Sequence, residues 1–189
     1  SRPIWESQAM SDQAGARRAA AWRRRRVIFN NDGDEVLFTP APATAEGYLS
    51  VRIDHMAGTD VDSLFHFPRR PISPLSQYAA ELGAAGTTLQ GLVELGTDDL
   101  QLAIDCCHQR HVEIVWSMRM NDIHDNFQDK AEIAQWKKDH MDMLLGTPAD
   151  KERYPKSDPR HVWTSADYAR QEVRDLMVET FRDALDQYD

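Results

Sequence analysis

Three short apolar runs in this chain each pass directly into polar or ionisable side chains, within residues 26–34, 60–68 and 112–125. Strands of a parallel sheet are covered on both faces, and for that reason they are typically near-continuous apolar runs. In open α/β folds and in barrels, ligands bind at the carboxyl ends of such strands. The pattern predicts three parallel strands whose carboxyl ends carry the chemistry of the protein.

A helix is predicted over residues 97–111, between the second and third runs. Thr97 is placed to cap it, and Asp98 and Asp99 put negative charge at the positive end of the helix dipole. Four apolar side chains follow the i, i+3, i+4, i+7 spacing of a helix packed on a sheet: Leu100, Ala103, Ile104 and Cys107. Strand, helix and strand together form a unit whose crossover is nearly always right-handed.

The remaining segments have weaker patterns. Helices are predicted over residues 44–57 and 170–188, and residues 131–145 are predicted to be partly helical. Residues 68–96 contain several Pro, Gly and Ser residues without strong periodicity, which indicates a long connection. Residues 151–159 are predicted to form a polar loop that contains Pro.

Composition narrows the class of protein. The chain has 189 residues, of which 41% are hydrophobic and 28% charged, as is ordinary for about one globular domain. No apolar run approaches the roughly 18 residues of a membrane span. The formal charge of −9 disfavours nucleic acid as the main partner, because phosphate binding draws on Lys and Arg. The arginine-rich residues 1–25 are therefore expected to form a basic arm or helix, followed by one domain over residues 26–189.

The sequence is compatible with either a reducing or an oxidising compartment. The only cysteines, Cys106 and Cys107, are adjacent within the predicted helix and cannot readily form an ordinary bridge. Residues 1–26 lack the apolar core of a signal peptide. A protein of this size can be exported without disulfides, so neither observation decides between a reducing and an oxidising compartment.

The third apolar run carries the densest group of candidate functional residues. Five polar side chains follow it: Arg119, Asn121, Asp122, His124 and Asp125. Asp122 and Asp125 supply carboxylates for catalysis or for binding hydroxyl groups. Arg119, Asn121 and His124 supply hydrogen bonds to a ligand.

The first two runs end in residues that are predicted to bind substrate beside this group. Asn30, Asn31 and Asp32 follow the first run, and His66 ends the second. The Asn-Asp-Gly turn at residues 31–33 lacks the alternating ligands of a calcium loop. Neither a resident metal nor a cofactor is expected.

From residue 26 onward, these stretches resemble the glycosyl-hydrolase-like barrel proteins, a broad group related to the retaining (β/α) barrel glycosidases. The specific part is the Arg-Met-Asn-Asp-x-His-Asp stretch over residues 119–125. Gln171 stands where the family often carries Pro, which affects only the start of the last helix. Weaker support comes from residues 27–34, residues 59–65, and Asp167 and Tyr168 followed by residues 172–175. The resemblance implies an α/β fold, namely a partial (β/α)8 TIM-type barrel of parallel strands alternating with helices, with carbohydrate as substrate.

The resemblance also implies further barrel units. In such proteins a helix ending in Tyr-Asp, as at Tyr188 and Asp189, leads into another strand with a terminal carboxylate. A closed barrel has eight strands and takes about 250 residues. The chain is therefore expected to be the amino-terminal portion of a larger barrel, and the missing carboxyl-terminal units are its expected partner.

Three functions remain open at this point. A glycoside hydrolase ordinarily needs two carboxyl groups flanking the scissile bond, and Asp122 and Asp125 are the candidates here, although they lie close in sequence. A metal-assisted hydrolase would gather His66, Asp122, His124 and Asp125 around one ion. A non-catalytic fragment that binds an oligosaccharide or polysaccharide is the third possibility, so the sequence leaves open whether the chain is an enzyme.

Overall fold

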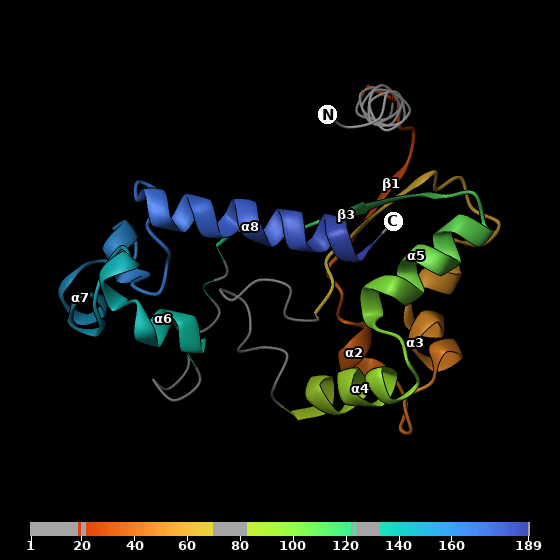
Figure 1. Cartoon of the computed structure of the whole chain (residues 1–189), viewed down its shortest axis with the longest axis horizontal. Helices are drawn as coiled ribbons and strands as arrows, with labels where there is room; N and C mark the ends of the chain where they lie inside the picture. The colour runs from red at the N-terminus through yellow and green to blue at the C-terminus, as the bar shows by residue number, and fades with distance from the viewer. Residues whose placement is uncertain (1–18, 20–21, 70–82, 122, 124–132, 189) are drawn as a thin grey trace, which may run out of the picture.

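A computed structural model describes residues 19, 22–69, 83–121, 123 and 133–188 of the chain. Its centre is a sheet of three strands, β1 (Ile28–Asn31), β2 (Ser63–His66) and β3 (Glu113–Trp116), in the order β1-β2-β3. Both neighbouring pairs are parallel (Figure 1). The predicted α/β fold with parallel strands is therefore confirmed, and each strand lies within one of the three stretches in which the sequence predicts it.

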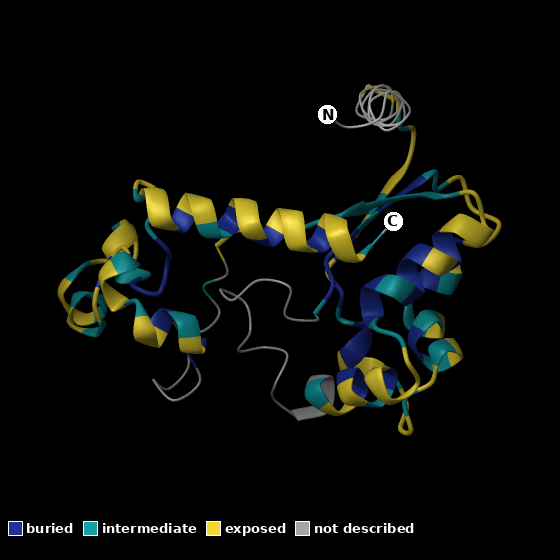
Figure 2. Cartoon of the chain, in the orientation of Figure 1, coloured by how far each residue is buried: buried dark blue, intermediate teal, exposed yellow. Residues whose placement is uncertain are grey.

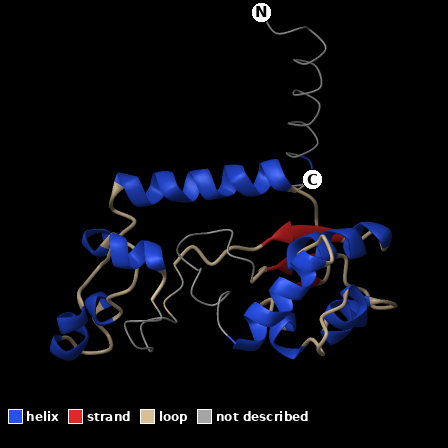
Figure 3. Cartoon of the chain, turned by 60° about the horizontal axis from the view of Figure 1, so that its bottom comes forward, coloured by secondary structure: helices blue, strands red, loops and turns tan. Residues whose placement is uncertain are grey.

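Helices connect the strands and continue after the last one (Figure 3). Between β1 and β2 lie α2 (Glu35–Phe38), α3 (Ala45–Val51) and the 3-10 helix η1 (Ile53–Met56). Between β2 and β3 lie α4 (Gly83–Glu94) and α5 (Asp99–Gln109). After β3 the chain forms α6 (Gln135–Asp139), η5 (Met141–Met143), α7 (Pro148–Arg153), η6 (Pro159–His161) and α8 (Gln171–Gln187).

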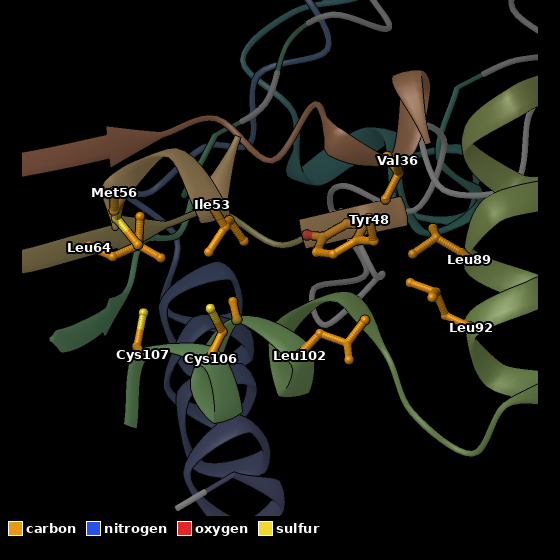
Figure 4. Close-up of a cluster of buried hydrophobic side chains, with 11 residues drawn as sticks. Val36, Tyr48, Ile53, Met56, Leu64, Leu89, Leu92, Leu102, Cys106 and Cys107 are labelled. Carbon is orange, nitrogen blue, oxygen red and sulfur yellow. The ribbon is translucent and has the colours of Figure 1, made fainter. Parts of the chain in front are cut away.

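The main core lies between one face of the sheet and the helices that connect its strands. The register places Phe29 beside Leu64 and Leu64 beside Ile114, and these three side chains belong to this core. Figure 4 shows Leu64 among side chains from α2, α3, η1, α4 and α5. The helix side of the core is Val36, Tyr48, Ile53, Met56, Leu89, Leu92, Leu102, Ala103, Cys106 and Cys107. Cys106 and Cys107 are free thiols, as their adjacency predicts.

The last helix, α8, runs from the region of α6 and α7 to the sheet (Figure 1). Its buried residues, Val173, Met177, Thr180 and Ala184, form one stripe, and the rest of its surface is largely exposed (Figure 2). At the sheet end of α8, the ring of Phe181 lies edge-on against that of Trp116, with 5.2 Å between the ring centroids. α8 thus joins the helix layer beside β3.

The structure corrects three local predictions. α4 occupies part of the predicted connection over residues 68–96. The apolar pattern of this helix is interrupted by Gly91. A side chain does not fit there, because an added Cβ would lie 2.9 Å from the Cβ of Ala43. The cap of α5 is Asp98, whose carboxylate accepts from Gln101 N–H at 2.9 Å, in place of Thr97. α7 takes the first residues of the predicted loop over residues 151–159.

The predicted helix over residues 44–57 divides into α3 and η1, and its start supports a test of capping. Thr44 Oγ1 accepts from Gly47 N–H at 3.0 Å. Thr44→Ala is expected to lower the free energy of unfolding by about 1 kcal/mol, because one amide at the helix start loses its acceptor. Thr44→Ser keeps the hydroxyl and is expected to change stability much less. Urea denaturation of both variants measures this, and equal losses would contradict a capping role.

The last residue of the amino-terminal arm contacts the sheet. Most of residues 1–25 lies outside the described part, but Arg25 Nε donates to Glu113 of β3 at 2.5 Å. Ser63 of β2 donates to the same carboxylate at 2.8 Å. Arg25, the last residue of the basic arm, is therefore ion-paired with the sheet. Within the part of the chain that the structure describes, no helix combines the length and apolar character needed to cross a membrane.

Candidate functional site

The carboxyl ends of the three strands meet at one edge of the sheet. Asn31 and His66 end β1 and β2 in register, and Trp116 lies beside His66 on β3. Phe67 N–H donates to Asn31 O at 3.0 Å and Ser117 N–H donates to His66 O at 2.8 Å, so the ladder continues one step further. Asn31, Asp32, His66 and Arg119, four of the predicted site residues, therefore lie at one edge of the sheet.

The two faces of the sheet divide the predicted site into two groups. Successive side chains of a strand point to opposite faces. Asn31 lies two residues beyond Phe29 and His66 two beyond Leu64, so both face the helix-covered core, where they are fully buried. Asn30 and Asp32 lie on the opposite face and are exposed. These residues, predicted as one cluster, thus form a buried group and an exposed group on opposite faces of the sheet.

The buried group is a hydrogen-bonded network between β1, β2, α2 and α3. Asn31 Nδ2 donates to Glu35 Oε1 and lies 3.2 Å from His66 Nδ1, while His66 Nε2 lies 3.3 Å from Tyr48 Oη. All four side chains are buried. The second carboxylate oxygen of Glu35 is buried too and has no hydrogen-bond partner in the described part of the chain.

These contacts assign the tautomer of His66. Asn31 Oδ1 accepts from Gly33 N–H at 3.3 Å, which leaves the two hydrogens of Nδ2 for Glu35 and for His66 Nδ1. His66 Nδ1 is then an acceptor, so the proton of the neutral ring is on Nε2 and is donated to Tyr48 Oη. Burial lowers the pKa of His66 to about 4 and keeps the ring neutral at neutral pH. Burial, with the charges of Asp99 and Glu35 nearby, raises the pKa of Tyr48 well above its ordinary value.

The exposed group is built around an ion pair that joins two strand ends. Arg119, after β3, lies 2.5 Å from Asp32 Oδ1, after β1. The guanidinium of Arg119 also lies over the ring of Phe67, after β2, at 4.8 Å from the centroid. The Asp32 side chain keeps 59% of its surface exposed and that of Arg119 keeps 26%. A carboxylate and a guanidinium thus stand together at the surface, held over an aromatic ring.

A second pair borders the first. Arg69 Nη2 binds Asp34 Oδ1, and the backbone N–H of Arg69 donates to buried Asp99 at 2.6 Å. The guanidinium of Arg69 lies 5.6 Å from the centroid of the Phe67 ring. Both guanidinium groups therefore lie close to the Phe67 ring, which is itself buried, so the ring supports the arginines and does not offer an exposed face for a ligand to stack on.

The other predicted site residues have different placements. Asn121 binds the backbone of Ala166 through both ends of its amide, accepting from N–H at 2.9 Å and donating to the carbonyl at 3.3 Å. It thereby ties the segment after β3 to the segment before α8. Asp122, His124 and Asp125 lie outside the described residues. Among the residues that are described, no three His, Cys, Asp or Glu side chains gather to hold a metal ion.

Sequence reasoning missed Glu35, Tyr48, Phe67 and Arg69. Strand parity offered a signal for Phe67, which follows His66 and so lies on the same face as Asp32. Glu35 and Tyr48 lie in the short helices α2 and α3, where no apolar run marks them as part of a site.

No protein-family model and no curated protein matches this chain. The inference of function therefore rests on the chemistry of the strand ends.

Proposed function

We propose that this chain is the amino-terminal part of a glycoside hydrolase-like (β/α) barrel and that the exposed edge of its sheet binds an oligosaccharide or polysaccharide. Support for the barrel comes from the sequential, parallel order of β1, β2 and β3 with helices packed on one face. In a barrel the face opposite the helices is the interior. Asn30 and Asp32 lie on that face, at the carboxyl end where barrel ligands bind.

The observation that carries the proposal is the ion pair of Asp32 and Arg119. Sugar hydroxyls both donate and accept hydrogen bonds, so a carboxylate beside a guanidinium offers a partner for each role. The guanidinium cannot be deprotonated in a protein, and the Phe67 ring beneath it limits its orientation. Asn30, exposed on the same face, adds an amide that donates and accepts.

Hydrolysis is a further step of the proposal. It requires an acid and a nucleophile or base, and Asp122 and Asp125 are the candidates within this chain, directly after Asn121. His124 would contact the substrate beside them. Non-catalytic binding of the same carbohydrates is the alternative, and it needs only the exposed pair.

Arg119→Ala tests the proposal on a panel of neutral and acidic polysaccharides. The variant is expected to lose about tenfold or more in affinity, because a charged hydrogen-bond donor to the ligand is removed. Its free energy of unfolding is expected to fall by no more than about 1 kcal/mol, since the ion pair is partly exposed and its carboxylate lies mostly in solvent. Affinity electrophoresis measures binding, and urea denaturation measures stability.

Arg160→Ala is the matched control. Arg160 also pairs with a carboxylate, Asp158 at 2.7 Å, and lies over an aromatic ring, Tyr154 at 3.7 Å. Its replacement is expected to leave polysaccharide binding unchanged. Equal loss in both variants, or no binding of the native chain to any polysaccharide, would contradict the proposal. Turnover that a chelator abolishes would favour the metal-assisted hydrolase instead.

A further inference from the structure

The buried network and the exposed ion pair are joined through one tight turn. Asn31 ends β1, Glu35 begins α2, and only residues 32–34 lie between them. Within this turn Asn31 is bound on the helix-covered face, through Glu35 and His66. Asp32, the next residue, has its side chain on the opposite face and meets Arg119.

The turn is also fixed from the sheet side. Phe67 N–H donates to Asn31 O at 3.0 Å, and a Cβ added to Gly33 would lie 1.8 Å from Phe67 O. Gly33 has a φ of 70° and its N–H donates to Asn31 Oδ1. The residues on either side of Asp32 are thus held by Phe67 and by the Asn31 side chain, and this sets the position from which Asp32 reaches Arg119.

We propose that Asn31 and Glu35 are positioning residues for the Asp32–Arg119 pair. Asn31 uses its whole amide in the turn: the oxygen accepts from Gly33, and the nitrogen donates to Glu35 and to His66. Glu35 is the carboxylate that orients this amide, and as the first residue of α2 it ties the turn to the helix layer. Loss of either contact frees the Asn31 amide to rotate, and with it the backbone that carries Asp32.

The test reads the ion pair directly, by NMR of the Arg119 guanidinium in the full 189-residue chain. A guanidinium held by a carboxylate rotates slowly about its Nε–Cζ bond and gives separate signals for its two terminal nitrogens, whereas a released one gives a single averaged signal. Arg119→Ala assigns the signals. Asp32→Asn removes the charge of this carboxylate and gives the reference for an Arg119 guanidinium without the Asp32 ion pair, in which the signals are expected to merge.

Two variants break the proposed link and one preserves it. Asn31→Ser is too short to reach Glu35, and Glu35→Met fills the same space without an acceptor; the Arg119 signals are expected to merge in both. Glu35→Gln keeps an oxygen for Asn31 and is expected to keep the signals apart. Two substitutions at separate residues keep the test decisive if one of them prevents folding.

Tyr48→Phe is the control for lost stability alone. It removes the hydroxyl at the far end of the His66 ring without touching Asn31 or Glu35, so it weakens the same buried layer and is expected to leave the Arg119 signals separate. Merged signals in Tyr48→Phe or Glu35→Gln would overturn the inference, as would separate signals in Asn31→Ser, Glu35→Met or Asp32→Asn.

The inference rests on the proposed function only in treating the ion pair as a ligand site. The NMR readout needs no ligand, so the two ideas fail separately. Separate signals in Asn31→Ser with intact polysaccharide binding by the native chain would overturn the positioning role alone. Merged signals as expected, with no binding to any polysaccharide, would remove the proposed function and leave the positioning role standing.

Discussion

Gly33→Ala is expected to lower the free energy of unfolding by about 3 kcal/mol or more, because two costs add at this position. The backbone of Gly33 has a φ of 70°, in the left-handed region that residues with a Cβ adopt at a cost of about 1 kcal/mol. The added methyl would also lie 1.8 Å from the backbone oxygen of Phe67, which cannot rotate away as a side chain does. The turn or the end of β2 must therefore shift.

Gly58→Ala separates the two costs. Gly58 has nearly the same φ, 74°, but a Cβ added there meets nothing within 4 Å. This variant is expected to lose only about 1 kcal/mol, the conformational part alone. Urea denaturation of both variants gives the difference, and a Gly33→Ala loss no larger than that of Gly58→Ala would show that the turn yields freely to the methyl group.

The strand ends were predictable from sequence because an apolar run that stops at a polar residue marks them without reference to the rest of the chain. The same reasoning brought Asp32 and Arg119 to one edge, since parallel strands share the direction of their carboxyl ends. Sequence reasoning could not predict the ion pair between Asp32 and Arg119, because that contact depends on the register of β1, β2 and β3. The register depends on how the three strands pack together, and no single apolar run determines it.

The division of the site between two faces was harder to predict. Parity shows that Asn31 and Asp32 point in opposite directions, but which of them is buried depends on where α2 and α3 pack. Glu35 shows the same limit, because a carboxylate at a helix start ordinarily serves the helix dipole and is left exposed. Its burial follows from the three-residue connection to β1, which draws α2 against the sheet. Asn121 bonds to Ala166 because an irregular segment folds back, and no periodic pattern marks such a contact.

The burial of His66 predicts that the stability of the fold falls in mild acid. The folded chain lowers the pKa of His66 to about 4, against an ordinary value of 6.5 that the unfolded chain regains. The unfolded chain therefore binds more protons between these two values, and stability rises with pH across that window. The contribution is complete above about pH 6.5 and is lost as the pH falls toward 4. Between pH 7 and pH 5, this group alone is expected to reduce the free energy of unfolding by about 2 kcal/mol.

His66→Gln measures this contribution. Glutamine offers an amide to Asn31 and Tyr48 but takes up no proton, so its free energy of unfolding is expected to fall by about 2 kcal/mol less than that of the native chain between pH 7 and pH 5. His108→Gln is the matched control, since His108 is exposed on α5 and stays in solvent whether the chain is folded or not. Urea denaturation at both pH values, on all three proteins, gives the comparison. If His66→Gln loses as much stability in acid as the native chain does, His66 is not the group that destabilises the fold, and the buried neutral ring assigned between Asn31 and Tyr48 is wrong.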